Sequence, residues 1–180
     1  TGLMTGHLEI EARNAEGEIT AYRQTDNEVV DDGEQCILKM LFATTDATAG
    51  RGGYASTGLG ACTGVLTGAW DVIGIGTTSA GSPADTGIKL GNETSTSNGL
   101  ERGVATTKTW TNGTADTTTK IVMSKTFTNL SANAHTIAES GLFNSTTVAG
   151  SGMLAHKEFT GVALSLNDSI TITWTFIVGN

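Results

Sequence analysis

The clearest pattern in the chain is the alternation of apolar and polar side chains near its end. In "SITITWTFIV" (169–178), apolar residues occupy every second position and Ser or Thr fills most of the positions between them. Because alternate side chains of a strand point to opposite faces, this pattern predicts a β-strand with one apolar face. The other face carries no Lys to discourage edge pairing, so we expect the strand to be central in its sheet or covered by another subunit.

A second alternation predicts a β-hairpin over residues 7–23, with the turn at "NAEG" (14–17). Apolar residues here alternate with charged ones, as expected for an antiparallel pair with one solvated face. Further strands are predicted at 70–76, 104–111, 119–130, 136–144 and 152–159, and the last two are expected to pair. With the final strand, this makes about eight strands.

The segment 25–43 departs from this period, because Val30, Ile37, Leu38, Leu41 and Phe42 recur at helical spacing. Acidic residues crowd its first turns, where the helix dipole favours them. We therefore predict one α-helix at about 28–43, or starting nearer 33 because Gly disfavours a helix interior.

Two long Gly- and Thr-rich loops are predicted at 44–69 and 77–103. Loops of this length are unusual inside a compact domain, so they are either mobile or ordered by a neighbouring molecule. The whole chain, 1–180, is predicted to be a single mainly β domain. Its architecture is expected to be an antiparallel β-sandwich, jelly-roll-like, with one α-helix.

The composition argues against several classes of partner. The net charge is -8, and the 10 Lys and Arg residues are scattered, which does not suit a nucleic-acid surface. No apolar run approaches the roughly 18 residues that a membrane span needs, and no signal peptide is recognised. For Cys36 and Cys62 we favour two buried free thiols, with a disulfide as the alternative.

No motif predicts catalysis or a cofactor. "GLGACTG" (58–64) and "GIG" (74–76) echo phosphate loops, but neither opens a helix and no Gly-Lys-Ser/Thr follows. The nucleophile elbow G-x-S-x-G is absent, and His7, His135 and His156 are interpreted as surface or hydrogen-bonded residues. We expect no enzyme.

Metal and glycan sites are weighed in the same way. "DNEVVDDGE" (26–34) lacks the alternating ligands of an EF-hand loop, so its acids are read as solvated, with a Ca²⁺ held by loop carboxylates as the alternative. The sequon N-x-S/T occurs at five positions, which matter only if the protein is exported in a glycosylating organism: Asn92, Asn112, Asn129, Asn144 and Asn167.

Two segments together resemble known proteins. They are "GEITAYRQTDNEVVDDGEQCILKMLFA" (17–43) and the stretch from "HTIAESGLFN" through "GMLAHKEF" to "DSITITWTFIVGN" (135–180). Their order is similar to that in small accessory virion proteins, of the head or tail, from tailed phages and related archaeal viruses. The resemblance implies a structural role and carries over no catalytic residues.

We therefore expect a viral structural protein that self-assembles in or on the virion, as a capsid decoration or stabilising protein or a tail component. Its partners would be copies of itself and other virion proteins, met in the virion after assembly in the host cytoplasm. Two alternatives remain. One is a subunit of an extracellular microbial filament built by strand addition. The other is a carbohydrate-binding module in which Trp70, Trp110 and Tyr54 form a stacking platform for a glycan.

Overall fold

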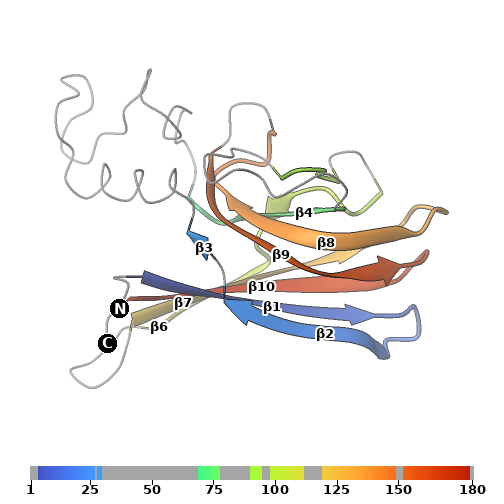
Figure 1. Cartoon of the computed structure of the whole chain (residues 1–180), viewed down its shortest axis with the longest axis horizontal. Helices are drawn as coiled ribbons and strands as arrows, with labels where there is room; N and C mark the ends of the chain where they lie inside the picture. Colours follow the sequence, from blue (N-terminus) through green and yellow to red (C-terminus); the bar gives the residue numbers. More distant parts are fainter. Residues whose placement is uncertain are drawn as a thin grey trace.

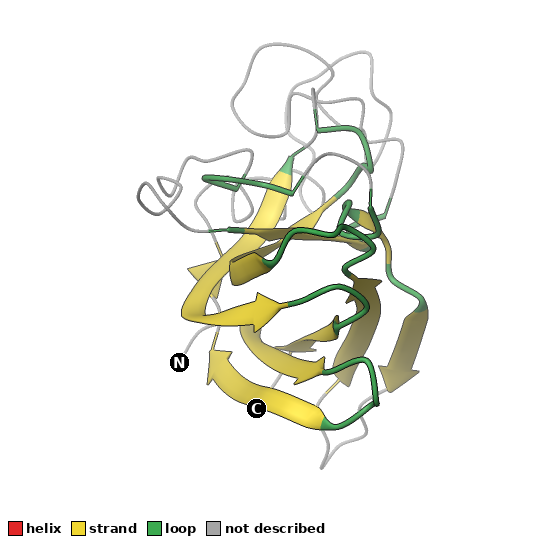
Figure 2. Ribbon diagram, turned by 90° about the vertical axis from the view of Figure 1, so that its right-hand side faces the viewer, coloured by secondary structure: helices red, strands yellow, loops and turns green. Residues whose placement is uncertain are grey.

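The computed structural model describes residues 4–26, 28–29, 69–77, 90–94, 98–111, 119–148 and 152–178. Ten strands account for all of the regular structure in these ranges. Figures 1 and 2 draw the strands as arrows. They form two five-stranded sheets in which every neighbouring pair is antiparallel. The predicted mainly β, antiparallel fold is therefore confirmed.

Sheet A has the order β2-β1-β10-β7-β6. Its strands are β1 (Met4–Arg13), β2 (Ile19–Asp26), β6 (Thr107–Thr111), β7 (Thr119–Thr128) and β10 (Ser169–Val178). Sheet B has the order β3-β9-β8-β4-β5. Its strands are β3 (Glu28–Val29), β4 (Val72–Gly76), β5 (Gly103–Val104), β8 (His135–Phe143) and β9 (Met153–Leu164).

The strand β10 is the centre of sheet A. It pairs with β1 from Met4↔Val178 to Arg13↔Ser169, and on its other side with β7 along the same ten residues. Its alternate residues Ile170, Ile172 and Trp174 are fully buried. The expectation that this strand lies centrally in its sheet is confirmed.

The inner faces of the two sheets share one hydrophobic core. In Figure 1, β4, β8 and β9 lie above β1, β2 and β10, and buried side chains from both groups belong to one cluster. The Trp174 ring stacks on Phe176, with ring centroids 5.9 Å apart. Its indole Nε1 donates to Ser140 Oγ of β8 at 3.3 Å, and Ser140 Oγ donates to the Gly74 carbonyl at 2.9 Å. The final strand therefore packs on β8 of the opposite sheet.

The predicted hairpin at 7–23 is formed by β1 and β2. Its turn is closed by Asn14, whose carbonyl accepts from Gly17 N at 3.0 Å and whose side-chain Oδ1 accepts from Glu18 N at 2.8 Å. Gly17 has φ +87, a backbone conformation that side chains disfavour. The predicted pairing of 136–144 with 152–159 is also confirmed, as β8 with β9.

The predicted helix at 28–43 is wrong at its first residues. Glu28 and Val29 form β3, which pairs with His156 and Ala155 of β9. Pairing with the backbone of β9 therefore determines the structure of these two residues and outweighs the local helical periodicity. The part of the predicted helix from 30 to 43 lies outside the described residues, and no α-helix occurs within them.

The predicted strand 104–111 is two strands in different sheets. Val104 ends β5 in sheet B, and Thr107 begins β6 in sheet A. Between them the chain crosses from one sheet to the other, where Ala105 N donates to the Asp71 carbonyl and Thr106 N to the Ser124 carbonyl, each at 2.7 Å. Of the predicted long loops, 44–68, 78–89 and 95–97 lie outside the described residues, as do Cys36 and Cys62.

Candidate functional site

The outer face of sheet B is covered by the chain itself. Leu90 packs there with Val72, Phe143 and Met153 in a second, smaller buried cluster. Gly74 and Gly141 are paired across β4 and β8. Because neither has a side chain, the Phe143 ring can lie close to the backbone at both positions. A Cβ on either glycine would lie 2.9 Å from the Phe143 ring, so a side chain at these positions would displace it. We call residues 90–94 and 98–102 the strap: Leu90, Glu93 and Arg102 cover this face, whereas Leu100 belongs to the main core.

A buried ion pair fastens the strap. The guanidinium of Arg102 donates through Nε and Nη2 to the two carboxylate oxygens of Glu93, and the two side chains are only 2% and 6% exposed. The guanidinium carbon lies 3.7 Å from the centre of the Phe143 ring, and Nη1 donates to the Ser145 carbonyl at 3.3 Å. A bidentate pair with an aromatic face beneath it is a favourable setting for a buried Arg.

A buried carboxylate of β8 holds the other end of the strap. Glu139 accepts from Asn92 N at 2.9 Å and from Gly91 N at 3.2 Å, and His156 Nε2 lies 3.3 Å from its Oε2. Burial alone would raise the pKa of Glu139, but the hydrogen bonds from His156, Asn92 and Gly91 outweigh it and hold the pKa below its usual value.

The buried polar side chains of Glu139, His156 and Ser140 lie on opposite sides of sheet B. Ser140 follows Glu139 in β8, but its hydroxyl is bonded to Gly74 and Trp174 in the interior. The Glu139–His156 pair instead faces the strap on the opposite side of the sheet. The three side chains therefore do not form a proton relay from carboxylate to imidazole to hydroxyl.

The three His residues predicted as surface or satisfied groups lie in separate settings. His7 of β1 is 3.4 Å from the Asp26 carboxylate in the hairpin, His135 begins β8 opposite Leu164, and His156 is the partner of Glu139. Among the described residues, no group of three His, Cys, Asp or Glu side chains could hold a metal ion. The acid-rich segment 26–34 lies mostly outside them.

The predicted sequons differ sharply in burial. Asn129 is fully buried, donates through Nδ2 to the carbonyls of Asn133 and Leu164, and accepts from Ser131 N at 2.9 Å. Asn144 is 5% exposed and accepts from Gly152 N.

Two other sequons, Asn92 and Asn167, are exposed, and Asn112 lies outside the described residues. Of the four sequons that the structure describes, Asn92 and Asn167 are therefore the two accessible to a glycan.

Sheet A is the open sheet of the molecule. Its edge strands β2 and β6 have eight and five residues, whereas the edges of sheet B, β3 and β5, have two each. Every residue of β6 is exposed, and so are most residues of β2. Large apolar side chains are exposed on both edges, with Trp110 at 61%, Ile19 at 54% and Tyr22 at 44%.

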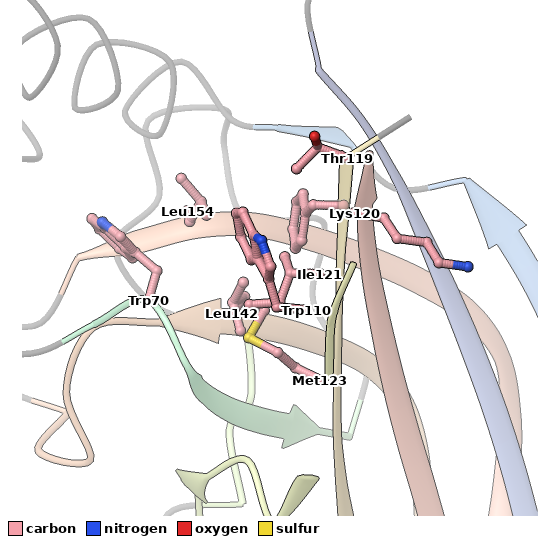
Figure 3. A pocket seen from close by; sticks show the side chains of 9 residues that line it. Trp70, Trp110, Thr119, Lys120, Ile121, Met123, Leu142 and Leu154 are labelled. Atoms are coloured by element: carbon pink, nitrogen blue, oxygen red, sulfur yellow. The ribbon is translucent and has the colours of Figure 1, made fainter. Parts of the chain in front are cut away.

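An apolar pocket of about 200 Å³ lies beside the β6 edge, between the two sheets. Figure 3 shows Trp110 of β6 and Trp70, which precedes β4, among its walls, with Leu142 and Leu154 from sheet B. The Lys120 amine points away from it in the same view. Two of the three residues of the expected stacking platform thus share one pocket, and Tyr54 lies outside the described residues.

Sequence reasoning missed the strap and its ion pair. Glu93 and Arg102 stand nine residues apart in a polar stretch that looks like an ordinary loop. The "GIG" motif (74–76) is similar to part of a phosphate loop in sequence, whereas in the structure Gly74 lies under the strap. The strap's local signals are Leu90 and Leu100, the two large apolar residues of an otherwise polar segment.

Within the described residues, no helix is long and apolar enough to cross a membrane. Comparisons of the chain with protein-family models, curated proteins and solved structures find no match.

Proposed function

We propose that the chain is a structural subunit that self-assembles in or on a virion, as a capsid decoration or stabilising protein or as a tail component. The observation that carries the proposal is the contrast between the two sheets. Within the described residues, sheet B has its outer face under the strap and edge strands of two residues each, whereas sheet A has two longer, exposed edge strands.

An open edge is a surface for association. Its unpaired N–H and C=O groups can bond to a strand of another chain, and natural proteins usually block such edges with Lys, Pro, bulges or a covering loop. The edge strand β2, "ITAYRQTD", contains neither Lys nor Pro, and Lys108 is the one Lys of β6. Edges of this kind are expected where neighbouring subunits cover them.

The fold class supports the same role. We infer a β-sandwich, jelly-roll-like in its architecture, because the sheets share one core and the chain crosses between them from β2 to β3, β5 to β6, β7 to β8 and β9 to β10. The segment from 135 to 178, which carries most of the resemblance to virion proteins, supplies β8, β9 and β10.

The proposal assigns the chain no catalysis, no cofactor and no nucleic-acid partner. The buried charged groups Glu93, Arg102, Glu139 and His156 are engaged with one another and with backbone groups of the strap and of its flanking loops. In this account, these groups keep the outer face of sheet B closed, which leaves sheet A as the surface for partners.

The test is assembly of the purified chain. Light scattering across a concentration series is expected to give a mass above that of the 18.5 kDa monomer, and electron microscopy is expected to find the chain on virus particles of its host. A strict monomer at every concentration, with no affinity for any particle, would refute the proposal.

A subunit of an extracellular filament is the second candidate, because the same open edges would serve strand addition. The mass of the intact protein from its native source separates the two. Glycans on the exposed Asn92 or Asn167 would favour the filament. A carbohydrate-binding module is favoured only by the shared pocket of Trp70 and Trp110, whose walls are almost entirely apolar and offer sugar hydroxyls few partners.

A further inference from the structure

The edge strand β6 has a sequence that complements itself. It reads Thr107-Lys108-Thr109-Trp110-Thr111, and all five residues are exposed. In an antiparallel pair formed about a two-fold axis, residues on opposite strands meet in reverse order. With Thr109 on the axis, each Lys108 faces the other copy's Trp110, and Thr faces Thr at the remaining positions.

We propose that β6 pairs with β6 of a second copy in this register, joining the two A sheets into one continuous sheet. The inference deepens the proposed assembly function and rests on it. The partner is a second copy of this chain, and the contact is isologous, so it closes as a dimer that the other edge, β2, can extend.

Side-chain alternation places the two kinds of contact on different faces. Trp110 lies in the pocket wall with Leu142 and Leu154 of sheet B, so it points to the inner side of sheet A, and Lys108 shares that side. Lys108 Nζ lies 2.6 Å from the Asp71 carboxylate. The three Thr residues line the outer side. Thr–Thr pairs directly across a sheet stabilise it, and a Lys amine over an indole gains a cation–π contact.

The charges select this register over its neighbours. Moving the axis to Lys108 would set two Lys ammonium groups directly opposite each other, which is destabilising. Moving it to Trp110 would leave each Lys108 beyond the paired residues and shorten the overlap. The Thr109 register uses the whole strand, brings no like charges together and covers Trp110, which is 61% exposed in the single chain.

The same pairing explains the place of the pocket. An added strand beside β6 would lie next to Trp110, which forms part of the pocket wall, with the partner copy's Lys108 opposite the indole. Pairing through main-chain groups, with side chains that set the register, is the usual form of strand addition.

The experiment is sedimentation or light scattering of three variants against the parent chain. Trp110→Lys places two Lys groups on each β6 and is expected to weaken dimerisation by at least about tenfold. The exchange variant Lys108→Trp/Trp110→Lys restores the opposite pairing of amine and indole, and it is expected to recover dimerisation even though it loses the Lys108–Asp71 ion pair. Tyr22→Lys on β2 is the matched control and leaves the dimer unchanged. The melting temperature of each variant confirms that it is folded.

The outcomes separate this inference from the proposed function. If Tyr22→Lys abolishes dimers and Trp110→Lys does not, the chain assembles through β2, so the β6 inference fails while the assembly function stands. If Trp110→Lys weakens association but the exchange variant does not recover it, the register is wrong. A parent chain that is monomeric at every concentration overturns both.

Discussion

Removing Arg102 tests how the strap is held. In the folded chain, Arg102 and Glu93 are 2% and 6% exposed and joined by two hydrogen bonds. Arg102→Met leaves the Glu93 carboxylate buried without its counter-charge. Breaking a buried pair in this way costs about 3–5 kcal/mol, and the lost contact of the guanidinium with the Phe143 ring, 3.7 Å away, acts in the same direction.

The double variant Arg102→Met/Glu93→Leu removes both charges and the need to solvate them. Replacing a buried pair by apolar residues of similar volume is often neutral or stabilising. We therefore expect the double variant to be more stable than either single variant, with a coupling free energy of about 2 kcal/mol or more. The assay is urea unfolding at low protein concentration, with the free energy of unfolding from linear extrapolation.

The matched control is the surface pair of Arg13 and Glu11, whose nitrogen and oxygen lie 2.7 Å apart but whose side chains are 44% and 29% exposed. Arg13→Met is expected to cost about 0–1 kcal/mol, since exposed pairs contribute little. Limited proteolysis adds a local readout, because a loosened strap is cut within 90–102 while the sheets stay intact. If Arg102→Met costs no more than Arg13→Met, the ion pair does not hold the strap and our reading of sheet B is refuted.

Three further predictions follow from other buried groups. Because the pKa of Glu139 is held below its usual value of 4.5, its stabilising bonds to the strap persist above that pH and are lost as the pH falls through the lower folded-state pKa. The free energies of urea unfolding of the parent and of Glu139→Gln should therefore differ at pH 7 and converge in strong acid. A difference that stays constant with pH would contradict this. The same comparison with His156→Gln tests the contribution of His156. Asn129→Asp, which removes buried amide donors, should cost about 1–3 kcal/mol, while Asn167→Asp at an exposed turn should cost under about 0.5 kcal/mol; equal costs would show that the Asn129 bonds contribute nothing. Deleting residues 170–180 should abolish the cooperative thermal transition, because β10 pairs on both sides and fills the core; a truncated chain that still melts cooperatively would assign the strand to an interface.

The strands could be predicted where the side-chain pattern is local. The alternation in 169–178 correctly predicts β10 and its apolar face. Ile172, Trp174 and Phe176 are two positions apart, so they point to the same face of the strand, and all three are buried. That β1 and β7 are its neighbours could not be predicted, since the residues that pair are at least 156 positions apart for β1 and at least 41 for β7, and local patterns do not record such pairing.

The failures have physical causes of the same kind. Glu28 and Val29 fit a helical period, but β9 offers them an unpaired edge, and this non-local pairing overrides the local preference. Glu93 and Arg102 look like ordinary surface charges, because only folding brings Glu93 to Arg102 and sets the Arg102 guanidinium over Phe143 of β8.

The candidate contact surface on β6 could be predicted only in part from the sequence. The sequence predicts "TKTWT" to be part of a strand and makes Trp110 a candidate, with Trp70 and Tyr54, for an aromatic platform. Its position at the edge of sheet A depends on the crossing at Ala105 and Thr106, which carries the chain out of sheet B after only two residues of β5. No alternation in the sequence marks that crossing.

Amide hydrogen exchange at low and high protein concentration tests the central claim, that sheet A is the surface through which copies assemble. The account predicts that amides of β6, and of β2 where assembly goes beyond the dimer, become protected as the concentration rises. Amides of β4, β8 and the strap should stay unchanged, because sheet B is already closed. Protection that appears on sheet B while β2 and β6 exchange as fast as in the dilute chain would contradict the account.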